Sequence, residues 1–331
     1  MNNKRHSGIG IFTPQVVVQP LWWDVDFLAE LPVEWELCWR HMKSGGTRVS
    51  FSFFATPRME FSWFKYDGAV FVEGIPPRGT IMISALRSKG TCNFRNQKLG
   101  QYELAILDSG EEVNYIADDE NEIFTLLIEK ELFEKTFLNY FGKTFKSTKS
   151  IKRLMLEDMD TDSFIFKMKR WLSFFYENNR KIDEKTYCDI EQEIIDVFFS
   201  LIKITNKESS SIKFDIKKAR EIIHENVDSL YKINDIVEEL NISSRTLQDN
   251  FKKQLGITPK QYLQNLRLNA IRKELISQNK KTVNVSDIAF KYGFFHSSHF
   301  TSEYKKLFGE TPTKTLTLMS TFTPPSISKI F

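Results

Sequence analysis

LQDNFKKQLGITP, from Leu247 to Pro259, and FTSEYKKLFGETP, from Phe300 to Pro312, are two copies of one pattern, and the second begins 53 positions after the first. Both copies keep a pair of lysines, a glycine and a Thr-Pro step at matching places. Both also carry a large apolar residue at every fourth position. An internal repeat of this kind indicates that one supersecondary unit is used twice.

The residues around the first copy predict a helix-turn-helix unit. Apolar residues over 233–240 follow helical spacing, and the chain then breaks at residues 241–243. A second helix follows, and its inner face carries Leu247, Phe251 and Leu255. Gly256 stands where a left-handed helix end needs glycine, and Pro259 fits the first position of a new, long helix over 260–278.

The second copy predicts the same unit again. Ser286 is the predicted cap of its first helix, Gly293 makes the turn, and the second helix buries Phe300, Tyr304 and Phe308. The outer faces carry Ser, Thr, Gln, His and paired lysines, which suit groove edges and phosphates. One such copy is equally well explained by two surface helices with solvated lysines. Two copies with the same turn chemistry favour a DNA-binding function.

Residues 231–316 resemble the DNA-binding domain of the AraC/XylS family of bacterial transcription regulators. The second copy carries the closer match, with SDIAFKYGF at 286–294 followed by the residues of its second helix and Thr311-Pro312. This resemblance implies two helix-turn-helix units joined by one long helix, and a cupin-like barrel in the N-terminal half. Ile271, where alanine is typical, and the Gly74-Ile75-Pro76 turn resemble the subgroup of the ethanolamine-utilisation operon regulator. That subgroup implies an amino alcohol effector, with a corrin cofactor, although no residue here indicates either.

The exposed positions of the two units are the predicted DNA contacts. Family members commonly carry an arginine on each recognition helix, where this chain has Asp249 and Ser302, so a family consensus site is not expected here. Asp249 could accept from cytosine or pair locally, and we favour the local role. The predicted base-reading residues are Ser244, Arg245, Gln248, Ser298, His299 and Ser302. The predicted phosphate contacts are Lys252, Lys253, Lys305 and Lys306.

Length and charge predict two domains and a linker. Residues 213–331 contain 19 Lys and Arg against 12 Asp and Glu, whereas the whole chain of 331 residues has a net charge of +3. A basic C-terminal half on an acidic N-terminal half fits nucleic-acid binding by one half only. We expect an effector-binding and dimerisation domain over 1–206, a Ser-rich linker over 207–212, and the DNA-binding domain over 213–320.

The N-terminal half predicts an α+β domain. Short apolar runs between turn signals over 47–128 indicate an antiparallel sheet that forms a small β-barrel or jelly roll. Helical stripes after about Lys130 either cover this barrel or pack against a second subunit, as in a homodimer. The many aromatic residues fill the core, or a few of them line a pocket for a small effector. The candidates for such a pocket are Phe53, Trp63 and Phe64.

No chemistry-bearing motif points to an enzyme. The predicted strands contain no histidine, and only His6 and His41 precede His224, so neither a metal site nor a cofactor is expected. Cys38, Cys92 and Cys188 are too far apart in sequence for metal or redox spacing. The sequence shows neither a membrane-spanning run nor a signal-peptide pattern, so we expect a cytoplasmic protein.

These observations predict a sequence-specific DNA-binding regulator, an activator, that responds to a small effector. Its expected partners are double-stranded DNA, RNA polymerase and a second copy of the chain. Two alternatives remain open at this point. One is a small-molecule-binding barrel or enzyme with an incidental helical tail, and the other is a regulator whose N-terminal half senses a protein.

Overall fold

The computed structural model describes residues 11–30, 36–95, 97–98, 103–145, 152–156, 160–178, 182–200, 202–204, 216–228, 231–277 and 284–319. The strands are β1 (Gln15–Asp24), β2 (Glu36–His41), β3 (Arg48–Ala55), β4 (Met59–Tyr66), β5 (Val70–Ile75), β6 (Thr80–Ser88), β7 (Cys92–Phe94), β8 (Gln97–Lys98), β9 (Glu103–Asp108), β10 (Val113–Ala117), β11 (Asn121–Glu129), β12 (Lys152–Leu156) and β13 (Ile202–Ile204). The helices are the 3-10 helix η1 (Val25–Glu30), α1 (Lys130–Phe141), α2 (Asp160–Asn178), α3 (Glu184–Ser200), α4 (Lys217–Glu225), α5 (Ile233–Glu239), α6 (Ser244–Leu255), α7 (Pro259–Ser277), α8 (Val285–Lys291), α9 (Ser297–Phe308) and α10 (Pro312–Met319).

The N-terminal domain contains two antiparallel sheets. One has eight strands in the order β1-β3-β4-β11-β6-β9-β12-β13, and the other has five in the order β2-β5-β10-β7-β8. Strands were predicted at all the apolar runs between 47 and 128, and each run is a strand in the structure. The edge strands of each sheet do not pair with each other, so neither sheet closes among the described residues. The cupin-like barrel is therefore not confirmed.

Side-chain alternation along the strands divides the core into layers. One face of each sheet contributes to a core between the two sheets, which includes Phe51 and Phe53 from β3 and Tyr115 from β10. The opposite face of the eight-stranded sheet packs against α1, α2 and α3. Ile194, Phe198 and other apolar residues of α3 are buried there, so the prediction that these helices cover the sheet is confirmed for the described residues.

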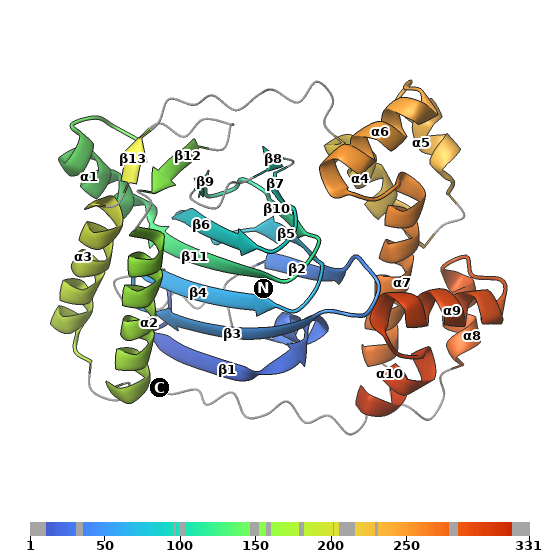
Figure 1. The fold of residues 1–331 in the computed structure, drawn as a ribbon, viewed down its shortest axis with the longest axis horizontal. Coiled ribbons are helices and arrows are strands. Elements are labelled where there is room, and N and C mark those ends of the chain that lie inside the picture. The colour runs from blue at the N-terminus through green and yellow to red at the C-terminus, as the bar shows by residue number, and fades with distance from the viewer. Residues whose placement is uncertain are drawn as a thin grey trace.

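The helical domain packs on the face of the five-stranded sheet that points away from the core between the two sheets (Figure 1). Its first half has a core built on Ile236, Phe251 and Tyr262, and this core also contains Phe71 of β5 and Ile116 of β10. Its second half has a separate core, centred on Leu268, Phe300 and Tyr304. The long helix α7 contributes to both cores, because it passes from one half to the other.

The predicted linker over 207–212 lies outside the described residues, so the domain boundaries stay predictions. Among the helices that the structure describes, none is both long enough and apolar enough to cross a membrane.

Candidate nucleic-acid interface

The first helix-turn-helix unit consists of α5 and α6. Asn241, in the turn between them, has φ of 49°, a left-handed conformation that asparagine tolerates better than most residues. Ser243 caps α6, because its hydroxyl accepts a bond from the N–H of Thr246 at 3.0 Å. Leu247 and Phe251 are fully buried, and Gly256 ends the helix with φ of 72°. The predicted unit is confirmed.

The second unit, α8 and α9, repeats this geometry. Gly293 makes the turn with φ of 83°, and Gly309 ends α9 with φ of 74°, within 2° of its counterpart Gly256. Phe300, Tyr304 and Phe308 are buried, as predicted. The predicted cap was wrong by two residues, because Asn284 caps α8 and accepts from the N–H of Ser286 at 3.0 Å.

All of the predicted DNA contacts lie on exposed faces of α6 and α9. The burial pattern leaves the following residues exposed: Ser244, Arg245, Gln248, Lys252, Lys253, Ser298, His299, Ser302, Lys305 and Lys306. The Arg245 side chain keeps 91% of its surface exposed, and its Nε lies 3.7 Å from a carboxylate oxygen of Asp249. This i,i+4 pair is the local role that we favoured for Asp249.

The C-terminal ends of both recognition helices face the N-terminal domain. In α6, the carbonyl of Gln254 accepts from the side-chain amide of Asn93 on β7 at 3.1 Å. The N–H groups of Gly45 and Gly46, in the turn between β2 and β3, donate to the carbonyls of Lys306 and Leu307 at 3.0 and 2.8 Å. These bonds satisfy carbonyls that a helix end leaves unpaired. A Cβ atom at Gly46 would lie 2.8 Å from the carbonyl oxygen of Phe308, so this close approach requires glycine.

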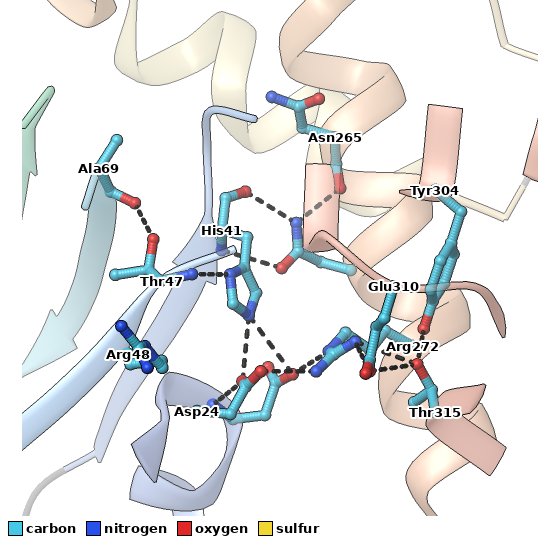
Figure 2. Close-up of polar contacts among 12 residues, drawn as sticks. Asp24, His41, Thr47, Arg48, Ala69, Asn265, Arg272, Tyr304, Glu310 and Thr315 are labelled. Carbon is cyan, nitrogen blue, oxygen red and sulfur yellow. Dashed lines mark hydrogen bonds and ion pairs between the residues drawn. The ribbon is translucent and has the colours of Figure 1, made fainter. Parts of the chain in front are cut away.

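A buried ion-pair cluster ties α7 and the second unit to the N-terminal domain (Figure 2). Arg272 of α7 is 2% exposed, and its guanidinium binds Asp24 at 2.6 Å, Asp26 at 2.5 Å and Glu310 at 2.8 Å. The same guanidinium donates to Thr315, and its carbon lies 4.7 Å from the ring centroid of Phe308. Three carboxylates around a planar, permanently charged group make this a geometrically specific contact.

His41 completes this cluster from β2. Its Nε2 lies 3.2 Å from Asp24 and 3.5 Å from Asp26. Burial disfavours the charged ring, but these two carboxylates outweigh it and raise the pKa of His41. The N–H of Thr47, however, donates to Nδ1 at 3.1 Å and needs a lone pair there. The raised pKa favours the charged ring, but a proton on Nδ1 would point at this N–H, so we assign the neutral tautomer, in which Nε2–H donates to Asp24.

A second cluster ties α4 and α7, which share a core with the first unit, to the five-stranded sheet. Arg40 of β2 and Arg220 of α4 both bind the carboxylate of Glu73 on β5. Burial would raise the pKa of Glu73, but the neighbouring cations, Arg40 first among them, lower it below its usual range. His224 of α4 shares a bond with the Tyr262 hydroxyl at 2.9 Å, and burial lowers its pKa to about 4.

The edge strand β2 thus contributes to both clusters, Arg40 to one and His41 to the other, and α7 covers its free side. The Asn269 side chain donates to the carbonyl of His41 at 3.0 Å and accepts from its N–H at 3.1 Å, as a neighbouring strand would. Asn265 donates to the carbonyl of Met42 at 2.9 Å. An exposed sheet edge is a template for association, and these two side chains occupy it.

Sequence analysis missed this interface. Its partners are up to 248 positions apart, and Asp24, His41 and Arg272 belong to no local motif. Ser44-Gly45-Gly46 was the one available signal, since two successive glycines often mark a close backbone approach. Asp24, Asp26 and His41 also lie close enough together to hold a metal ion, but Arg272 already binds both carboxylates.

The three predicted effector residues do not line one surface. Phe53 and Phe64 belong to the core between the sheets, whereas Trp63 packs on the helix side of the eight-stranded sheet. There the Trp63 ring stacks on Phe124, and the ammonium of Lys169 lies 3.9 Å from its centroid. The buried indole Nε1 of Trp63 has no hydrogen-bond partner among the described residues.

Comparisons with known proteins agree with this geometry. The family model described as "Helix-turn-helix domain" matches residues 236–317. The XylDLEGF operon transcriptional activator 3 of Pseudomonas putida is 23% identical over 294 residues, which cover 84% of this chain and 85% of that protein. The XylDLEGF operon transcriptional activator 1 of the same species is 36% identical over 96 residues, which cover 29% of each chain.

Two solved structures to which the chain is similar cover different shares of it. An AraC-type DNA-binding domain protein from Chromobacterium violaceum is 29% identical and covers 33% of this chain and 94% of its own, with a TM-score of 0.30. ToxT from Vibrio cholerae is 14% identical and covers 79% of this chain and 98% of its own, with a TM-score of 0.30.

Proposed function

We propose that this chain, an AraC-type DNA-binding transcription regulator, activates transcription by placing α6 and α9 in successive major grooves on one face of a promoter. The observation that supports this most directly is the repeated unit geometry, with both recognition helices exposing polar residues and burying their apolar faces. The 19 residues of α7 span roughly 28 Å, and the bodies of the two units bring this close to the roughly 34 Å of one DNA turn. Activation is proposed because the relatives above are described as transcriptional activators.

Direct readout is proposed to come chiefly from the first unit. Arg245 and Gln248 lie three positions apart on α6, so they share a face that is turned away from the buried Leu247. Arginine and glutamine offer bidentate hydrogen bonding to base edges, whereas the serines and His299 of α9 offer single contacts. The paired lysines of both helices are proposed as phosphate contacts that set position and affinity.

Control by the N-terminal domain is proposed to act through β2. Arg40 and His41 are consecutive, yet Arg40 belongs to the cluster with α4, which shares a core with the first unit, and His41 to the cluster beside Phe308 of the second. A shift of this strand therefore bears on both units at once. A small effector is the proposed cause of such a shift. The indole nitrogen of Trp63, which has no hydrogen-bond partner in the part of the chain that the structure describes, offers a donor for it.

The proposal does not extend to the ethanolamine subgroup. Gly74 has φ of 148°, and a Cβ atom there would lie 1.9 Å from the carbonyl oxygen of Glu36. The close pairing of β2 with β5 therefore explains this glycine without any effector.

Two further partners are part of the proposal. RNA polymerase is the expected contact of an activator. A second copy of the chain is the proposed occupant of the outer face of α2, where Phe166 and Tyr176 are 64% and 53% exposed. Light scattering of the full chain should then give twice the mass of one chain, and substituting both residues by Ser should return the monomer mass.

The proposed DNA-binding function is tested with the full chain and the DNA upstream of its own gene and neighbouring genes. Fluorescence anisotropy should show tighter binding to one segment than to shuffled DNA of equal length. Equal affinity for all DNA would show that binding is not sequence-specific. The absence of any DNA binding would favour the alternative of a small-molecule-binding protein. A thermal-shift screen of metabolites on the full chain distinguishes a small effector from a protein partner.

A further inference from the structure

The two units border a cavity of about 460 Å³ in the helical domain, and it is open to solvent on one side. Its walls come from the start of α5, the first half of α7, the turn between α8 and α9, and the first residues of α9. The lining residues on which the inference depends are Lys232, Lys260, Arg267, His296 and His299.

The charge of this lining is one-sided. It includes three permanent or near-permanent cations, Lys232, Lys260 and Arg267, together with two imidazoles. None of the described lining residues is Asp or Glu. Lys232 and Lys260 are exposed, while Arg267 is fixed by bonds to the carbonyls of Val227 and Tyr231 at 3.1 and 3.2 Å. A cavity of this composition favours an anion.

The cavity lies on the side of α7 that faces away from the N-terminal domain. Asn265, Asn269 and Arg272, which contact that domain, follow helical spacing along one face of α7. Lys260 and Arg267, which line the cavity, lie roughly half a turn around the helix from that face, at 3.6 residues per turn. The two recognition helices also have their C-terminal ends toward the N-terminal domain, so the start of α9, with His296 and His299, opens on the cavity side.

We propose that this cavity seats the DNA backbone where the minor groove crosses between the two recognition helices, with Lys232 and Lys260 as phosphate contacts. The inference rests on the proposed function. If α6 and α9 enter successive major grooves, the intervening minor groove and its phosphates pass in front of the space between the units. That space is this cavity. Helix spacing alone had pointed only to the lysines on α6 and α9 themselves.

The test uses the full chain, its preferred DNA segment and the variants Lys232→Gln, Lys260→Gln and the double variant. Each single change should lower the slope of log affinity against log salt concentration by about 1, and the double change by about 2. Base preference should not change. Ethylation of the phosphates that flank the central minor groove should weaken binding of the unmodified protein, and this interference should be lost in the double variant.

Lys291→Gln is the matched control, because Lys291 lies on α8 in the same domain and its ammonium binds Glu274 at 2.9 Å, outside the cavity. This control should keep the original salt slope. An unchanged slope in the double variant, with DNA binding retained, would overturn the cavity assignment alone and leave the cavity as a site for a small anion. Failure of the unmodified protein to bind DNA would instead refute the proposed function.

Discussion

Arg245 and Lys305 occupy comparable exposed faces of the two recognition helices, but their side chains suit different parts of DNA. The planar guanidinium of Arg245 can make two hydrogen bonds to guanine, so Arg245→Ala should cost roughly 1–3 kcal/mol of binding free energy and relax preference at one or two base pairs. Lys305→Ala should weaken binding to all sequences alike. Affinity for a panel of single-base variants separates the two effects. Unchanged preference in Arg245→Ala, with altered preference in Lys305→Ala, would reverse the assignment.

Phe251 lies in the core of the helical domain, so its substitution tests packing and not DNA contact. It is fully buried and packs edge-on against Tyr262 at 5.5 Å between ring centroids. Phe251→Ala should lower the free energy of unfolding by roughly 3–5 kcal/mol, since it leaves a cavity in the core. Chemical denaturation followed by circular dichroism measures this loss, and Gln248→Ala on the exposed face serves as the control. Equal stability of the two variants would contradict the assigned helix faces.

At the residue scale, the sequence predicted the repeated units well because local chemistry determines them. Glycine at a left-handed helix end and proline at a helix start act within a few residues, so Gly256, Pro259 and Gly309 could be interpreted without tertiary information. The roles of Arg272 and His41 could not be predicted, because a buried ion pair depends on which distant segments meet.

At the scale of elements, the contact of α7 with the end of β1 and with η1 depends on Arg272. Arg272→Met should leave Asp24, Asp26 and Glu310 without their shared cation, and removing one partner of a buried ion pair costs roughly 3–5 kcal/mol. We expect thermal unfolding followed by calorimetry to show the helical domain melting earlier than in the unmodified chain. The exposed variant Arg245→Ala should leave the melting profile unchanged. A profile for Arg272→Met identical to the unmodified one would show that this cluster does not couple the domains.

The sheets show where elements can and cannot be predicted. Short apolar runs between turn signals correctly predicted β3, β4, β5, β6, β9, β10 and β11, because strands that are buried on both faces are apolar along most of their length. Barrel closure was not predictable, because it depends on which strands pair at the edges. Here Asn265 and Asn269 of α7 cover the edge strand β2. The sequence of neither segment contains a pattern that predicts this contact.

At the scale of the whole molecule, His224 makes stability depend on pH. Its pKa is about 4 in the folded protein, against about 6.5 when unfolded, so the unfolded chain binds more protons between these values. The corresponding stability is fully present above pH 6.5 and is lost as the pH falls toward 4. Denaturation across this range should show a shallower pH dependence for His224→Gln than for the unmodified chain. Equal pH dependence would mean that His224 is not held neutral at the interface between α4 and the sheet.

The most direct test of the account is a hydroxyl-radical footprint of the full chain on its preferred promoter segment. Two units held by one 19-residue helix should protect two stretches about 10 base pairs apart on the same face of the DNA. Methylation of guanine N7 should interfere within both major grooves and most strongly in the one that Arg245 enters. Protection confined to a single groove, or two protected stretches on opposite faces, would contradict the proposed mode of binding.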